Sequence, residues 1–276
     1  MGEKKEMFRD AFLPALMAVA SGGLIFDQSA LGQGRGNAFA FGDYLVAPVR
    51  VHLLAAKQCD AIQTTLLETD ITRILEKVNG VWAQAGLHFY VESIVREEAN
   101  HQESYRLAAR GEDHSQLPEL RPPGSKATNM FHIYYLKEMG VNGIFFPDGM
   151  FVKDTASLRT VADGLDEPLP RVTSHELGHA FGLSHRQDTT NLMASGTTGA
   201  WLNEEEITQA RAAACKCGWI EPAPDLMKKA NTLFRANQMK EAAALYSRLA
   251  TIPVRNQQVE LAKRRSARLQ VKSKER

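Results

Sequence analysis

Residues 174–185 read Ser-His-Glu-Leu-Gly-His-Ala-Phe-Gly-Leu-Ser-His, and this stretch determines the fold expected for the rest of the chain. His175 and His179 are four residues apart, so on a helix they share one face and can bind the same metal ion. Glu176 follows the first histidine and can reach a metal-bound water without binding the metal itself. The stretch therefore predicts a helix that carries two metal ligands and a base.

Gly182 and His185 extend the pattern to H-E-x-x-H-x-x-G-x-x-H. A glycine adopts a left-handed backbone at little cost, so Gly182 can end the helix and return His185 as a third nitrogen ligand. The short form H-E-x-x-H occurs by chance in many helices, whereas the longer form fixes five positions. Three neutral imidazoles with an open fourth position are typical of a catalytic zinc site, not a closed structural one.

Met193 lies eight residues after His185, before a turn of small residues. Alone, such a methionine is most often ordinary core. With the long zinc motif it resembles the metzincin metallopeptidases, in which a Met-turn lies beneath the metal. The resemblance, which spans about residues 45–218, implies an α+β zincin domain: a twisted mixed sheet, an active-site helix and a long backing helix. It also implies one zinc ion bound by His175, His179 and His185, with Glu176 as general base and Met193 as the structural floor of the site.

The chain departs from particular metzincin families at several positions. Some families place a tyrosine ligand two residues after the Met-turn methionine, where this chain has Ser195. Families also differ in the residue after the third histidine, which here is Arg186. Archaemetzincins add cysteines soon after the zinc motif, and none lies between His185 and Met193. The family within the clan is therefore left unassigned.

Length and composition limit the remaining possibilities. A chain of 276 residues with 44% apolar residues can bury one good core and a small second unit. Thirty-three basic and 32 acidic residues give a net charge of +1, which argues against specific nucleic-acid binding. No apolar run reaches the roughly 18 residues of a membrane span. Nothing in the sequence supports a calcium site.

The N-terminus resembles an export signal. Basic residues at positions 4, 5 and 9 precede an apolar run over 11–20, and Ala30-Leu31-Gly32 offers a small-x-small cleavage site. We therefore expect a signal peptide over 1–32, a short segment over 33–44, and a secreted, periplasmic or cell-envelope protein. The alternative is a buried amphipathic N-terminal helix.

The catalytic domain is predicted over residues 45–220. Alternating or continuous apolar residues indicate strands over 49–54, 87–95 and 131–136, and apolar residues at helical spacing indicate a long helix over 61–85. The polar stretch 97–126 reads as a surface insertion. Thr173 or Ser174 is a candidate cap of the zinc helix, and Asn203 with Glu206 predicts the capped start of a last helix.

Metzincins bind the substrate backbone on an edge strand before the zinc helix, by strand addition. The resemblance makes Asn142, Gly143, Ile144 and Phe145 the candidate substrate-binding segment; an ordinary core hairpin is the alternative. Trp201, at the end of the loop over 197–201, is expected to line the pocket, and core packing is its rival role.

Three cysteines are present, at positions 59, 215 and 217. In an exported protein Cys59 is expected to pair with Cys215 or Cys217, which leaves one thiol over. Cys215 and Cys217 read alternatively as a metal pair, but C-x-C without a partner pair is weak evidence.

Residues 221–276 form a segment of different composition. Residues 221–224 read as a linker, and residues 225–250 resemble one tetratricopeptide unit, followed by a strongly basic tail. One such unit cannot bury its apolar face alone. It must dock on the catalytic domain, on the helix that follows, or on a protein partner.

Together these features predict a secreted zinc endopeptidase that acts on protein or peptide substrates. A zinc hydrolase of a narrow non-protein amide would use the same residues. A catalytically weak partner-binding module is the third possibility, against which the intact Glu176 and His185 argue.

Overall fold

The computed structural model describes residues 39–103, 105, 114–125 and 127–274. The predicted signal peptide and most of the segment 33–44 lie outside these residues. The elements follow in the order β1, α1, β2, β3, β4, β5, α3, α4, β6, α5, α6, α7, with short 3-10 turns between them. None of the described helices is long and apolar enough to cross a membrane.

A mixed sheet forms the centre of the molecule, with strand order β2-β1-β3-β5-β4. Its strands are β1 (Leu45–Ala55), β2 (Leu87–Glu98), β3 (Phe131–Leu136), β5 (Gly149–Lys153) and β4 (Gly143–Phe146). The first four pair in parallel, and β4 pairs antiparallel with β5 at the edge. β1 is buried along nearly its whole length, His52 included, because a central parallel strand is covered on both faces. The predicted mixed sheet is confirmed.

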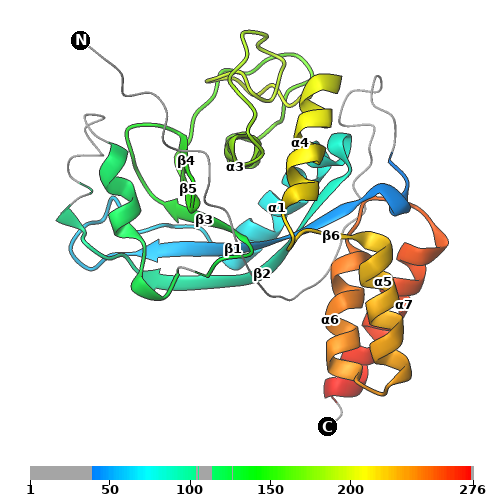
Figure 1. Ribbon diagram of the computed structural model, residues 1–276. Coiled ribbons are helices and arrows are strands. Elements are labelled where there is room, and N and C mark those ends of the chain that lie inside the picture. Colours follow the sequence, from blue (N-terminus) through cyan, green and yellow to red (C-terminus); the bar gives the residue numbers. More distant parts are fainter. Residues whose placement is uncertain (1–38, 104, 106–113, 126, 275–276) are drawn as a thin grey trace, which may run out of the picture.

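Three helices cover one face of this sheet: α1 (Glu68–Trp82), α3 (Pro168–Ala180) and α4 (Glu204–Lys216). Apolar residues of all three share one buried cluster with Val49, Val51 and Leu53 of β1. Figure 1 shows α3 and α4 above the sheet, with β4 beside α3. The sheet edge and the metal-binding motif are therefore neighbours in space.

The helix predicted over 61–85 is shorter in the structure. It begins at Glu68 and ends at Trp82, with a 3-10 turn over Ala83–Ala85. The preceding residues are held by other partners: Thr64 N donates to Leu54 O, and the Thr64 hydroxyl donates to Asp154. These bonds tie the segment to the end of β1 and keep it out of the helix.

The C-terminal helices are α5 (Ala223–Arg235), α6 (Met239–Ala250) and α7 (Gln257–Lys274). Their apolar faces share a second buried cluster with Phe41, Tyr44, Val46 and Tyr90. The expected linker over 221–224 is wrong, because residues 221–222 form strand β6, which pairs antiparallel with Leu45 and Val46, and residues 223–224 begin α5. The helical segment is thereby joined to the sheet by both a strand and a shared core.

The expected disulfide is not formed, and all three cysteines are free. Cys59 follows the C-terminal end of β1, whereas Cys217 precedes β6, which pairs with the N-terminal end of β1. The 11 residues of β1 span about 33 Å. A disulfide requires Cα atoms within about 7 Å, so Cys59 reaches neither Cys215 nor Cys217.

Candidate metal centre

Helix α3 brings the first two histidines to one face, as the sequence predicts. It begins earlier than expected, at Pro168, where the fixed φ of proline suits the first helical position. Neither Thr173 nor Ser174 caps it, since both lie inside the helix; Thr173 instead bonds the Tyr135 hydroxyl at 2.8 Å. The helix ends at Ala180, and Gly182 adopts φ +79°, the left-handed turn predicted for it.

The three histidines meet at one point. The Nε2 atoms of His175, His179 and His185 are each 3.2 Å from the other two. No other group of three His, Cys, Asp or Glu side chains within the described ranges comes together in this way. The sequence prediction that these three residues converge agrees with the structure.

Hydrogen bonds decide which nitrogen faces the centre. Nδ1 of His175 donates to Leu192 O at 2.8 Å, and Nδ1 of His179 donates to Leu183 O at 2.9 Å. A carbonyl oxygen only accepts, so both rings carry their proton on Nδ1. Burial, and then the nearby Arg171 cation, lowers the pKa of His175 to about 3, which keeps its ring neutral at pH 7. The Nε2 lone pairs therefore point at one another.

This arrangement fits a metal ion. Converging lone pairs repel each other unless a cation lies between them. Nitrogens about 2.0–2.1 Å from a tetrahedral zinc lie about 3.3 Å apart, close to the 3.2 Å observed between the Nε2 atoms. Metal-binding histidines usually donate their other ring N–H to a carbonyl or carboxylate oxygen, as His175 and His179 do here. The donor set and its spacing fit a zinc ion.

Glu176 lies beside the histidines and is almost fully buried. Burial raises the pKa of its carboxyl to about 8, and the neighbouring Arg171 opposes this rise. Across from it, Gly143 of β4 has no side chain: a Cβ there would lie 2.6 Å from Glu176 Oε1. The glycine therefore lets the sheet edge approach the carboxyl closely.

The Met-turn lies directly under α3. Met193 is fully buried, and a Cβ on Gly178 would lie 2.5 Å from its sulfur. The turn is closed by Asn191, whose side-chain oxygen accepts from Met193 N at 2.6 Å. The Met193 side chain thus occupies the space that a side chain at position 178 would need, so only glycine fits there.

Arg171 is a residue of this site that the sequence analysis missed. It lies one helical turn before His175 and is 2% exposed. Its Nε donates to Gly199 O at 3.0 Å, and its Nη2 donates to Ala194 O. Burial lowers its pKa to about 10, so it stays charged at neutral pH. Arg171 therefore joins the zinc helix to the Met-turn and to the loop that follows.

A cavity opens over the three histidines and Glu176. It is also lined by Asn142, Gly143, Ile144 and Phe145, the predicted substrate segment, and by Arg171, Ser195 and Gly196. Trp201 is not among its lining residues; its backbone pairs with Thr190 and Leu192 instead. Strand β4 is half-buried and, among the strands that the structure describes, pairs with β5 alone; its residues 143–145 line this cavity.

No family profile and no curated protein matches this chain. Solved structures resemble it weakly. Archaemetzincin from Methanopyrus kandleri is 17% identical, with a TM-score of 0.41 over 62% of this chain and 96% of that chain. Metalloproteinase-II from Bacteroides fragilis is 14% identical, with a TM-score of 0.38 over 67% of this chain and 60% of that chain.

A chain from a structure of a chaperone–substrate complex is 11% identical, with a TM-score of 0.39. The match covers 65% of this chain but only 35% of that one. At these scores the similar structures assign no family or function to the chain. The function proposed below depends instead on the geometry of the three histidines.

Proposed function

We propose that the protein is a zinc-dependent endopeptidase with a metzincin-like catalytic domain. The observation that carries the proposal is the triangle of Nε2 atoms 3.2 Å apart, next to a buried carboxyl in the same cavity. His175, His179 and His185 would hold one zinc ion. When bound, zinc lowers the pKa of a water towards ~7 and polarises a carbonyl oxygen.

Glu176 supplies the proton transfers in this proposal. Its carboxylate takes a proton from the attacking water and returns it to the leaving amine. The carboxyl is buried beside Gly143 of β4 and lines the same cavity as the three histidines. Its raised pKa suits a group that must both accept and release a proton.

The outer edge of β4 orients the substrate. Ile144 and Phe145 line the cavity, and their strand has one edge that pairs with none of the described strands. An extended peptide that pairs with this edge places its backbone beside the metal-binding histidines. Backbone pairing tolerates many side chains, which favours an endopeptidase over a hydrolase of one small amide.

A mixed peptide library tests this function. Zinc-loaded protein is expected to cut internal bonds, while Glu176→Ala retains zinc and loses at least about 100-fold in rate. His179→Ala is expected to lose both zinc and activity. An active Glu176→Ala protein would refute the role of Glu176. Zinc binding without any cleavage would instead favour a narrow amide substrate.

Export is part of the same proposal. The signal peptide over 1–32 is expected to be removed, which N-terminal sequencing of protein from the medium or periplasm would show. Intact N-termini in the cytoplasmic fraction alone would contradict it.

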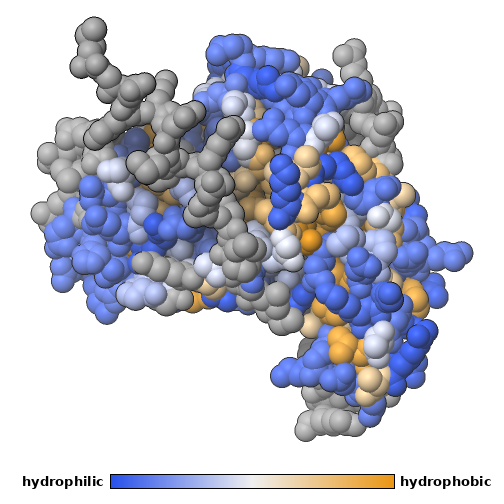
Figure 2. All heavy atoms as spheres, in the orientation of Figure 1, coloured by the Kyte–Doolittle hydropathy of each residue, from blue (hydrophilic) through white to orange (hydrophobic). Residues whose placement is uncertain are grey.

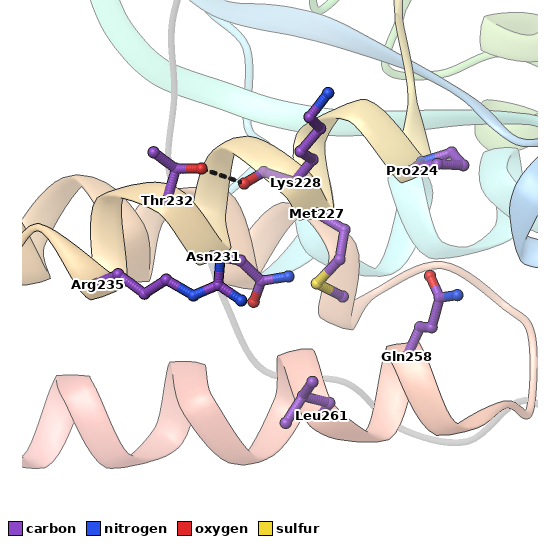
Figure 3. A pocket seen from close by; sticks show the side chains of 8 residues that line it. All are labelled: Pro224, Met227, Lys228, Asn231, Thr232, Arg235, Gln258 and Leu261. Atoms are coloured by element: carbon purple, nitrogen blue, oxygen red, sulfur yellow. Dashed lines mark hydrogen bonds between the residues drawn. The ribbon is translucent and has the colours of Figure 1, made fainter.

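A groove on the C-terminal helices favours a second function, the docking of an acidic peptide segment. Met227, Asn231 and Arg235 of α5 face Gln258 and Leu261 of α7 across it (Figure 3). The Asn231 oxygen already accepts from Tyr246 and Arg265, which leaves its amide N–H groups for a ligand. Figure 2 shows hydrophobic atoms on these helices within a mostly hydrophilic surface.

Charge selects the occupant of this groove. Lys228 and Arg235 line the groove and form no ion pair within the described part of the chain, and Met227 and Leu261 give its lining apolar side chains. An acidic segment with apolar side chains complements both features. Arg235→Glu should weaken binding of a labelled Glu/Leu peptide several-fold, whereas Lys240→Glu, outside the groove, should not. Equal loss in both variants would indicate only a general charge effect.

A further inference from the structure

The three histidines are not held equally. His175 and His179 lie on α3, and each donates from Nδ1 to a backbone carbonyl. His185 lies beyond the helix, is exposed, and its Nδ1 forms no hydrogen bond to any described residue. Its ring position must therefore be set by the backbone that carries it.

Arg186, the next residue, fixes that backbone. Its N–H donates to Met193 O at 2.9 Å, which joins the ligand loop to the Met-turn. Its Nε donates to Glu206 Oε1 at 2.8 Å, and its Nη2 donates to Glu205 Oε2 at 2.8 Å. The Glu205 side chain is 73% exposed and that of Glu206 is 1% exposed, so the two bonds differ greatly in their surroundings.

Glu206 joins three parts of the site through one carboxylate. Its Oε2 accepts from Asn191 Nδ2 at 2.8 Å, and Asn191 closes the Met-turn. The same oxygen accepts from Asn203 N at 2.9 Å, at the start of α4. A buried carboxylate is tolerated only when such donors and a cation surround it, and here Arg186 is the cation.

We infer that Glu206 is a positioning residue for the third metal ligand, acting through Arg186 and the Met-turn. The inference rests on the proposed zinc site and adds to it the residues that set its least constrained ligand. Loss of the Arg186–Glu206 bond is expected to displace His185 alone. His175 and His179 stay in place on α3, so the site binds metal more weakly but keeps two of its three ligands. The expected effect is on metal affinity and coordination geometry, more than on folding.

The test compares Arg186→Gln, Glu206→Gln and the matched control Glu205→Gln in the full chain. Zinc dissociation constants are measured by competition with a chelating dye, and cobalt-loaded protein is measured by visible absorption, which reports coordination geometry. Arg186→Gln and Glu206→Gln should each bind zinc about 10–100-fold more weakly. Glu205→Gln removes the exposed half of the same pair and should stay close to wild type.

Urea unfolding of the metal-free proteins separates positioning from a structural role. Arg186→Gln leaves the buried Glu206 carboxylate without its cation and is expected to lose stability, but the glutamine amide can still donate to that carboxylate, so the variant is expected to fold. Arg186→Lys retains one bond to Glu206 and should recover part of the affinity. Unchanged zinc affinity in Arg186→Gln would overturn the inference. A wild-type protein that binds no zinc would instead overturn the proposed function itself.

Discussion

Gly143 shows how much of the site depends on a side chain that is missing. A Cβ at this position would lie 2.5 Å from Val172 Cγ1 and 2.6 Å from Glu176 Oε1. Gly143→Ala must therefore push the carboxyl or the edge strand out of place. We predict a fall in kcat of about 10–100-fold, because a displacement of about 1 Å in a reacting group costs this much.

The measurement that isolates this effect is kcat alongside zinc affinity, which should remain near wild type because no histidine moves. Gly218→Ala serves as the control, since a Cβ there has nothing within 4 Å. Equal kcat values for Gly143→Ala and wild type would show that contact with β4 does not set the position of the Glu176 carboxyl.

Residues with a role fixed by local spacing were predictable, and residues with distant partners were not. His175 and His179 follow from helical periodicity, and His185 follows from the left-handed glycine before it. Arg171 and Glu206 carry no such local pattern. Arg171 bonds backbone carbonyls around residues 194–199, and Glu206 bonds Arg186, 20 residues earlier. Only the folded structure brings these groups together.

At the scale of elements, α3 rests on the Met-turn through Gly178. Alanine usually stabilises a helix interior relative to glycine by about 0.5–1 kcal/mol. Here the added Cβ would lie 2.5 Å from Met193 Sδ, and the sulfur is fully buried. Gly178→Ala is therefore predicted to destabilise the protein by about 1–3 kcal/mol, the cost of overpacking a core.

Urea unfolding of wild type, the two single variants and the double variant checks this sign. The double variant Gly178→Ala/Met193→Ala should lose less stability than the sum of the single variants, because the smaller side chain makes room for the Cβ. A stabilised Gly178→Ala protein would mean that helix propensity outweighs the contact.

The ends of helices were predictable where the capping residue bonds a residue close to it in the sequence. Asn203 caps α4 as predicted: its side chain accepts from Glu206 N at 2.9 Å. The start of α1 was misplaced because the bonds of Thr64 to Leu54 and Asp154 compete with helix formation. Strand β6 was read as a linker because two residues carry no periodicity, and its pairing with β1 joins residues far apart in sequence.

At the scale of the whole molecule, the C-terminal helices are part of the structure that supports the sheet. Arg248 of α6 lies over the Tyr90 ring of β2 at 4.4 Å, and Phe41 and Tyr44 pack among the helices. The sequence predicted helices that must dock somewhere, but not which surface receives them. The same limit explains the cysteines, whose separation is set by the length of β1.

His88 lies in this contact and makes its stability depend on pH. It is fully buried on β2. The Thr251 hydroxyl, just after α6, donates to Arg248 O, so it accepts from His88 Nε2 at 2.9 Å. Burial lowers the pKa of His88 from 6.5 to about 3, so the folded state keeps the ring neutral. Between pH 6.5 and 3 the unfolded chain binds the extra proton, and stability falls as the pH falls. At pH 5 this linkage costs about 2 kcal/mol relative to pH 8.

His88→Gln removes this titration while its amide can still donate to Thr251. The variant is predicted to lose less stability than wild type between pH 8 and pH 5, in urea unfolding at each pH. Other buried histidines, such as His132, titrate in both proteins and cancel in the difference. If the stability of both proteins changed equally with pH, the pKa of His88 would not be lowered in the folded state. A shallower profile in the variant would show that acid weakens the molecule at the contact between the sheet and its C-terminal helices.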